Sequence, residues 1–530
     1  MHNSSFGRRA TLRATALAIC VAGIGGAVFL LASSMALADS NTGAQPVPTA
    51  EAEQPVPTAE ADMNPAGSAP DDFGPVDTKP LWSLANVAPG VYSYFNDGAV
   101  FGLPGTRVGS ITERTQLTND WGGTRTKWAR KGVFLNLYNT TAYQQISGGL
   151  EPGDAIINNT ELSLDLDTGR LGWWSGGLFH LAVEARIGSD NSKVYGAGTL
   201  TPTYYGAVLP QPGKDNDVLF TNLFLQQVFG KAGMIAGVIP GLYVPDRTMF
   251  GDDWRRFFGN YAFNETPLFP QFSNQQTTTL TGTYRPNEKL NFSLGVYDAN
   301  TDVTDISKDF FEEIYIYGQG TYNYEASGLP GQVLVGALWS NQEKLNLRDP
   351  ISISMAGAGA PPTTRPGTTN LTGNTKDSSG FVNANFSQYL YIKTAPERRK
   401  DIMAMGEPLR GVGIFGRIGY APPETVAITK HFSLALLAHG LVDARPNDSF
   451  GIGVSYNELS GDLKNGVRAF SGGDISIDDE SVIEVFYDVG ITPAISLNTS
   501  YQHVWNPFAA ALAGGDDSAD ILMVRLHTEW

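Results

Sequence analysis

Charged side chains alternate with apolar ones in several segments of the sequence. In LFHLAVEARI, residues 178–187, His180, Glu184 and Arg186 face away from the apolar side chains if the segment is extended. Three other alternating segments each contain a charged residue: Arg417 in GVGIFGRIGY, Glu484 in SVIEVFYDVG and Arg525 in ADILMVRLHTEW. Carboxylates and guanidinium groups in such rows form charge-assisted hydrogen bonds with polar molecules. The pattern favours a polar, ligand-contacting surface.

Signatures of catalysis and metal binding are missing from the sequence. It has no G-x-S-x-G nucleophile motif, no H-E-x-x-H motif and no histidine cluster. The single cysteine, Cys20, lies near the N-terminus, which excludes a disulfide framework and a thiolate metal site in the rest of the chain. Carboxylates are plentiful, but nothing sets two of them at the separation that glycoside hydrolysis needs. We therefore expect no enzyme, no cofactor and no metal.

The first 80 residues predict export followed by a linker. Three arginines precede an apolar run at 14–31, and an A-x-A site ends at Ala38, so residues 1–38 are predicted to be a signal peptide. In residues 39–80, QPVPTAEAE recurs at once as QPVPTAEAD. This Pro/Ala/Glu-rich segment cannot bury a core and is expected to be a disordered linker.

Alternating strands dominate the chain from residue 133 to residue 530. ELSLDLD at 161–167 and LFHLAVEARI each have one apolar and one polar face, and together they predict an amphipathic hairpin. Beyond residue 38 there is no apolar run of the roughly 20 residues that a membrane helix needs. Some connections are short, whereas the one at 341–380 is long and irregular. Outer-membrane barrels distribute their connections in this way.

Two classes of protein could carry such strands. In a soluble sandwich the apolar faces would need one very large shared core, whereas in a membrane barrel they meet acyl chains and the ionic faces line a wet interior. Trp173, Trp174 and Trp530 stand at turns or strand ends, where barrels have aromatic girdles. The sequence predicts an all-β fold, a transmembrane antiparallel β-barrel at residues 133–530 with long extracellular loops. We expect it in the bacterial outer membrane, in contact with lipid.

The segment at 81–132 precedes the predicted barrel. A short helix is predicted at 124–130, between Gly123 and Gly132, and the segment could be inserted in the barrel. The formal net charge of the chain is -17, which argues against nucleic acid as a partner.

Four segments, in this order, resemble those of the carbohydrate-selective outer-membrane porins, the OprB-like family. They are LTNDWGGTRTKWARKGV at 117–133, LDLDTGRLGWWSGGLFHLAV at 164–183, GLVDARPNDSFGIGVSYNELS at 440–460 and VIEVFYDVGITPAISLNTSYQHVWNPF at 482–508. The resemblance implies a barrel of 16 strands that passes small sugars, such as glucose, into the periplasm by passive diffusion. It also implies that Trp530, in place of the usual Phe, is read by the barrel-assembly machinery.

The resemblance turns the charged rows into candidates for contact with sugar. The pore-lining candidates are Arg125 in the WGGTR motif, together with His180, Glu184, Arg186, Arg417, Glu484 and Arg525. For each of them an ordinary ion pair of a wet wall is the alternative. At the level of the protein, the alternatives are a general diffusion porin without sugar selectivity and a secreted β-rich carbohydrate-binding protein or hydrolase. The sequence also leaves open whether the barrel is a monomer or a homotrimer.

Overall fold

The computed structural model describes residues 110–112, 114–188, 195–205, 216–240, 246–301, 309–349, 374–396, 399 and 408–530. The predicted signal peptide, the predicted linker and most of the segment at 81–132 lie outside the described residues.

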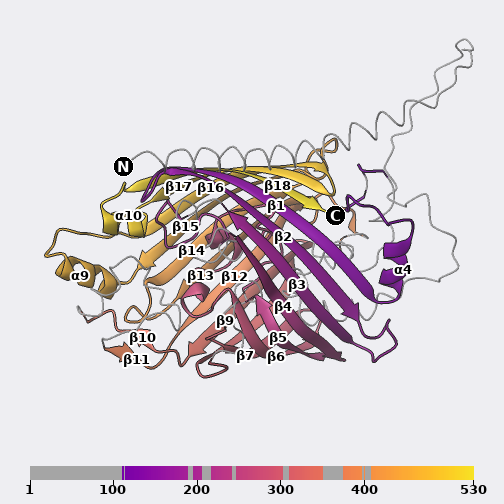
Figure 1. The fold of residues 1–530 in the computed structure, drawn as a ribbon, viewed down its shortest axis with the longest axis horizontal. Helices are drawn as coiled ribbons and strands as arrows, with labels where there is room; N and C mark the ends of the chain where they lie inside the picture. Colours follow the sequence, from indigo (N-terminus) through magenta and orange to yellow (C-terminus); the bar gives the residue numbers. More distant parts are fainter. Residues whose placement is uncertain are drawn as a thin grey trace, which may run out of the picture. The chain divides into compact units, whose positions relative to one another are not determined.

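Sixteen antiparallel strands form one closed barrel (Figure 1). Their bounds are β1 Val133–Gly148, β2 Gly153–Asp167, β3 Gly177–Gly188, β4 Asn216–Phe229, β5 Ala232–Pro240, β6 Gln276–Asn287, β7 Leu290–Asp298, β8 Ile314–Ala326, β9 Leu329–Ser340, β12 Ser379–Ile392, β13 Gly411–Tyr420, β14 Ile428–His439, β15 Ser449–Leu459, β16 Glu480–Thr492, β17 Ile495–Trp505 and β18 Ser518–Glu529. Each strand pairs with the next one along the chain, β9 pairs with β12, and β18 returns to β1. The predicted fold and the implied number of strands are confirmed.

The alternation of polar and apolar residues in the sequence corresponds to the inner and outer faces of the barrel wall. In β3 the side chains of His180, Glu184 and Arg186 are buried, whereas the alternating Ile187 is half exposed. The register with β2 places Glu161 opposite Glu184 on the inner face. A strand has a side-chain period of two, so a slip of one residue would send these charges into lipid. The alternating pattern therefore determines the pairing register of the strands as well as their extended conformation.

The connections at the two ends of the barrel differ in length. At one end, four hairpins have connections of only two residues, at 230–231, 288–289, 327–328 and 493–494. At the other end the connections include 189–215, 241–275 and 341–378. The last of these carries the small hairpin of β10, Lys344–Leu345, and β11, Thr375–Lys376. The long connections supply the chain that can fold back over or into the barrel.

A few short helices accompany the barrel: α4 Thr124–Arg130, α6 Tyr261–Asn264, the 3-10 helix η3 Phe269–Gln271, α9 Gly461–Phe470 and α10 Phe508–Ala513. The helix predicted at 124–130 is confirmed as α4. In the part of the chain that the structure describes, no helix is both long enough and apolar enough to cross a membrane.

Helix α4 lies against β1 close to the seam where β1 meets β18 (Figure 1). Its buried Arg125 donates to the backbone oxygen of Leu135 at 2.8 Å and to that of Trp530 at 3.1 Å. The guanidinium group also lies 4.9 Å from the ring centroid of Trp121. Arg125 therefore links the segment before the barrel to both strands of the seam. The role of Trp530 as an assembly signal stays a prediction.

We expect Arg125→Ala to destabilise the barrel. The change removes the hydrogen bonds from a buried charged donor to two backbone oxygens, each of which contributes roughly 1.5–3 kcal/mol. Lys127→Ala, on the exposed side of the same helix, is the matched control. The measurement is urea unfolding of each variant in detergent micelles, followed by tryptophan fluorescence. Equal unfolding midpoints for the two variants would contradict this role of Arg125.

Candidate functional site

The connection between β5 and β6 folds into the barrel, and its described part, residues 246–275, is called the inserted loop. It carries α6 and η3 and is bound by side chains of β3, β12, β13, β16 and β18. In the closed order of strands, β3 and β13 lie far apart around the wall. A loop held from such separated strands crosses the interior and narrows it.

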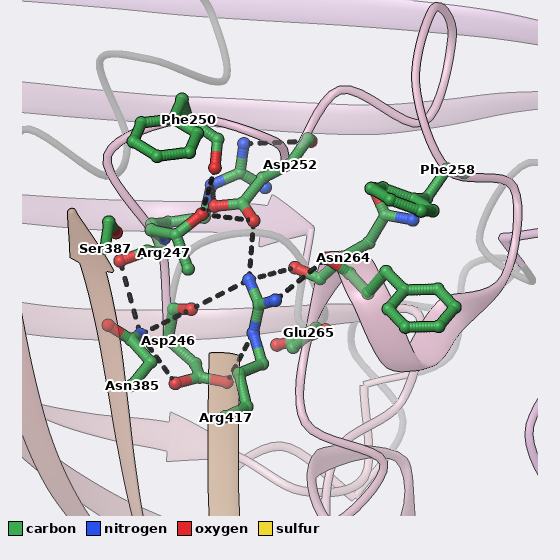
Figure 2. Close-up of polar contacts among 12 residues, drawn as sticks. Asp246, Arg247, Phe250, Asp252, Phe258, Asn264, Glu265, Asn385, Ser387 and Arg417 are labelled. Carbon is green, nitrogen blue, oxygen red and sulfur yellow. Dashed lines mark hydrogen bonds and ion pairs between the residues drawn. The ribbon is translucent and has the colours of Figure 1, made fainter. Parts of the chain in front are cut away.

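Arg417 of β13 is the central attachment of the inserted loop (Figure 2). Its Nε lies 3.2 Å from Asp246 Oδ2, and one Nη lies 2.5 Å from Asp252 Oδ1. The same guanidinium group donates to the carbonyl oxygens of Phe263 at 2.8 Å and Asn264 at 3.0 Å. Its side chain is fully buried. A buried cation needs opposite charges and filled hydrogen bonds, and the loop supplies both.

Asp246 carries the attachment on to the neighbouring strand β12. Its carboxylate accepts hydrogen bonds from Asn383 Nδ2 at 2.8 Å and from Asn385 Nδ2 at 2.9 Å. It also accepts from the backbone N–H of Thr266 at 3.0 Å. The backbone φ of Asp246 is 59°, in the left-handed region that Asp tolerates better than most residues. The Asp246 carboxylate thus attaches the first described residue of the inserted loop to both β12 and β13.

Two more of the predicted residues hold the loop from the seam side. Glu484 of β16 accepts the backbone N–H groups of Gly259 at 2.8 Å and Asn260 at 2.9 Å. Arg525 of β18 donates to the backbone oxygen of Trp254 and to Asn498 Oδ1, the latter at 2.7 Å. Both side chains are completely buried. They therefore satisfy backbone groups that the loop would otherwise bury unpaired.

The charged row of β3 makes contacts of two kinds. Arg186 pairs with Glu184 at 2.8 Å and donates to Gln275 Oε1, at the end of the inserted loop, at 2.9 Å. His180 Nδ1 instead contacts Asp165 Oδ1 of β2 at 2.6 Å, and its ring stacks on Phe224 at 5.0 Å between centroids. The row thus joins the wall to the loop at one end and cross-links two strands at the other.

The loop presents its own charged side chains where water reaches. Arg247, Asp253, Arg255 and Arg256 have side-chain exposures between 12% and 26%, in a loop whose other side chains are mostly buried. Arg256 Nε pairs with Asp253 Oδ2 at 2.6 Å. Sequence reasoning missed these residues because a loop has no strand periodicity. The run DDWRRFFGN at 252–260, dense in charged and aromatic residues within a connection, was the available signal.

Arg255 is held in one place by several partners. One of its Nη atoms lies 3.0 Å from Glu161 Oε2 of β2. The guanidinium group also lies 4.9 Å from the ring centroids of both Tyr138 and Trp254, a cation–π distance. A side chain fixed in this way keeps its guanidinium group in one orientation.

Comparison with known proteins decides the family. The carbohydrate-selective porin family OprB matches residues 152–530 of the chain. The chain belongs to this family. It is a channel protein of the bacterial outer membrane, selective for carbohydrates.

Individual relatives are distant in sequence. Porin B of Pseudomonas aeruginosa is 21% identical over 472 residues, which cover 81% of this chain and 95% of that protein. Porin AaxA of Chlamydia muridarum is 23% identical over 286 residues, 50% of this chain and 57% of that protein. The high-pH structure of Pseudomonas putida OprB superposes with a TM-score of 0.62 at 18% identity, covering 78% of this chain and 98% of that one. That structure shows the same fold.

A second connection contributes aromatic side chains to the interior of this OprB-family barrel. Tyr204 and Tyr205, between β3 and β4, are buried beside the inserted loop. The ring of Tyr205 stacks on that of Tyr261 at 5.0 Å, and the ring of Tyr204 meets Trp254 edge-on at 5.9 Å. Nearby, Glu480 of β16 accepts from backbone N–H groups of the same connection. The two connections pack on each other and support the loop from one side.

The long connection after β9 also reaches the inserted loop. Lys344 of β10 donates from Nζ to the backbone oxygen of Gln271 at 2.6 Å and lies 4.8 Å from the ring centroid of Phe272. Burial lowers the pKa of the Lys344 ammonium to about 8. The connection after β9 thus places a buried amine against the last part of the inserted loop.

The predicted residues fall into groups by what they touch. Arg186, Arg417, Glu484 and Arg525 bind the inserted loop directly, Glu184 acts on it through Arg186, and His180 and Arg125 bind the wall and the seam. Whether any of them contacts a sugar stays a prediction. Within the described part of the chain, no three His, Asp or Glu side chains converge so as to hold a metal ion.

We expect Arg417→Met to loosen the inserted loop. The change leaves Asp246 and Asp252 buried without their cation, and breaking a buried pair in this way costs about 3–5 kcal/mol. The barrel should still close, because its strand ladders are untouched. Single-channel conductance in planar bilayers should rise and fluctuate in the variant.

The matched control for Arg417→Met is Lys430→Met. Lys430 belongs to the next strand, β14, and forms an exposed pair with Glu458 at 2.9 Å, a kind of pair that contributes at most about 1 kcal/mol. Steady, unchanged conductance in the Arg417 variant would show that the loop does not depend on this attachment.

Proposed function

We propose that sugars cross this porin past the inserted loop, and that the water-accessible charges of the loop set the preference for sugar. The observation that carries the proposal is that Arg247, Asp253, Arg255 and Arg256 are the charged side chains of the loop that water reaches, while buried residues of the wall hold the backbone beneath them. The residues predicted from the strands then act as supports, one layer behind the side chains that meet the sugar.

The chemistry of these groups suits a neutral polyol. A guanidinium group offers several N–H donors in a plane, and a carboxylate offers acceptors, so together they replace the water that a sugar hydroxyl gives up. The contacts must stay weak and repeated, because a pore that binds its solute tightly does not conduct. The arginines of the loop meet that condition, since each is held by a partner in the protein and is still partly exposed to water.

Pre-organisation supports the same proposal. Arg255 is held by Glu161 and by two aromatic rings, and Arg256 is held by Asp253. A fixed side chain loses little entropy when a solute passes, so weak contacts still discriminate.

Swelling of proteoliposomes tests the proposal against general diffusion. We expect glucose, and more slowly a disaccharide, to enter faster than an amino acid of similar size under isotonic conditions. Equal rates for glucose and the size-matched amino acid would leave a general diffusion pore. No swelling with any solute would contradict conduction itself.

We expect Arg255→Gln to lower the preference for sugar. The change removes the positive charge next to Glu161. The loop therefore loses a charged hydrogen-bond donor, and the side chain at this position is no longer held in one orientation. Contacts inside a wet pore are shared with water, so the ratio of glucose to amino-acid swelling rates should fall by about threefold rather than vanish. Arg348→Gln is the matched control, because Arg348 is an exposed arginine that pairs with Asp462 outside the barrel sheet.

A further inference from the structure

Five neutral polar side chains lie next to one another on the inner face of the barrel. They are Thr283 of β6, Asn291 and Ser293 of β7, and Gln319 and Thr321 of β8. In the register of the strands, Ser293 lies between Thr283 and Gln319, and Asn291 lies beside Thr321. Together they form one patch, which we call the neutral wall.

The alternation of exposure along the strands shows that the neutral wall faces the interior. Thr283, Asn291 and Thr321 are only 5–7% exposed. The residues that alternate with them are large and exposed, such as Phe292 at 45% and Leu294 at 63%. Successive side chains of a strand point to opposite faces of the sheet. The apolar residues therefore face lipid, and the neutral wall faces the channel.

The neutral wall begins at the inserted loop and continues away from it. Earlier along β8, the Tyr315 hydroxyl lies 2.9 Å from Ser273 Oγ of the loop. Gln319 Oε1 then accepts a hydrogen bond from the backbone N–H of Asp246, the first described residue of the loop, at 3.3 Å. The strand runs on to the turn at 327–328, and short turns of outer-membrane barrels face the periplasm. The neutral wall thus extends from the loop toward the periplasm.

Two atoms of the neutral wall are buried with no hydrogen-bond partner among the described residues. They are the hydroxyl oxygen of Thr283 and the side-chain oxygen of Asn291. Ser293 and Gln319 beside them are half-buried, so water reaches this part of the interior. A buried polar atom is normally hydrogen-bonded, because losing water without a replacement is unfavourable. The partner of these two atoms therefore comes from the contents of the channel, either water or a passing solute.

The neutral wall carries no charge, unlike the strands that hold the inserted loop. On the inward faces of β6–β9, the charged residues are Arg285 and Glu325, and both lie close to the two-residue turns. Arg255 of the loop instead contacts β1 and β2, which lie far from β8 in the closed order of strands. A solute next to the loop thus has charged groups on one side and neutral groups on the other.

Hydroxyl and amide groups suit an uncharged sugar. Each sugar hydroxyl both donates and accepts hydrogen bonds, and so do the side chains of Thr, Ser, Asn and Gln. An ionised solute of the same size would give up water here and meet no opposite charge, which is unfavourable. The chemistry of the neutral wall therefore favours uncharged polyols over ionised solutes.

We propose that the neutral wall is a second sugar site, which a neutral sugar occupies between the inserted loop and the periplasm. Thr283 and Asn291 contact the sugar through the two atoms that have no partner in the described protein. The inference rests on the proposed function, because a second site matters only for sugar that passes the loop. Two weak sites in series let the sugar leave the loop in steps, which keeps conduction fast.

Glucose added to one side of a single channel at a time tests the second site. From the side of the two-residue turns, glucose reaches the neutral wall before the loop, whereas from the other side it reaches the loop first. Thr283→Val and Asn291→Leu, made separately, remove the two atoms and nearly keep the size of the side chain. In both variants the frequency of current interruptions by glucose on the turn side should fall about fivefold, the effect of losing a neutral hydrogen bond. The frequency with glucose on the other side should not change.

Ser433→Ala is the matched control. The Ser433 hydroxyl is also buried without a partner among the described residues, but it belongs to β14, against which α6 of the inserted loop packs. The control should leave both frequencies unchanged. Unchanged salt conductance and the heat-dependent gel shift of a closed barrel show that each variant is folded. An unchanged turn-side frequency in both variants, an equal fall from both sides, or the same fall in the control would overturn the second site.

Swelling of proteoliposomes separates this inference from the proposed function. If glucose enters with the unaltered protein no faster than a size-matched amino acid, the proposed function fails, and the second site fails with it. If glucose keeps its advantage and the two variants leave the turn-side frequency unchanged, the second site alone is wrong.

Discussion

The structure depends on one constraint, which is that every backbone N–H and C=O in hydrocarbon must be paired inside the protein. The pairing of β18 with β1 meets it, because a closed sheet has no edge. Closure then forces each strand to have a lipid side and an inner side. The inner side holds charges that would be costly anywhere else. The alternation of the sequence, the register of the hairpins and the burial of Glu184 and Arg417 all follow from this division.

The buried charged residues of the barrel wall hold the inserted loop in place. A loop folded into the barrel brings carbonyls, amides and carboxylates with it, and each needs a partner once water is displaced. Arg417, Glu484 and Arg525 are those partners, and each reaches the backbone of the inserted loop. Arginine suits this task because one guanidinium group serves several carbonyls and carboxylates at once. On the proposed function, the side chains that meet a passing solute belong to the loop, so selectivity would depend on how the loop is attached.

Much of the fold could be predicted from the sequence, because strand periodicity is local and the constraint of the membrane is simple. The hairpin around residues 161–187, the helix at 124–130 and the long connection at 341–380 were predicted near their observed places. The path of the inserted loop could not be predicted, since it depends on contacts between residues far apart in the chain, such as Asp246 with Arg417. The candidate residues were therefore assigned to direct contact with solute, whereas their partners in the structure are loop, seam and wall.

Ion current through a single channel tests most directly whether the inserted loop meets the sugar with fixed charges. If sugar dwells at the loop, glucose should cause brief interruptions of the current. Their frequency should rise with the glucose concentration and then reach a plateau. A polyol with the same effect on bulk conductivity but a different arrangement of hydroxyl groups should interrupt it less. A current that falls only in proportion to the conductivity of the solution, and equally for both solutes, would contradict the account.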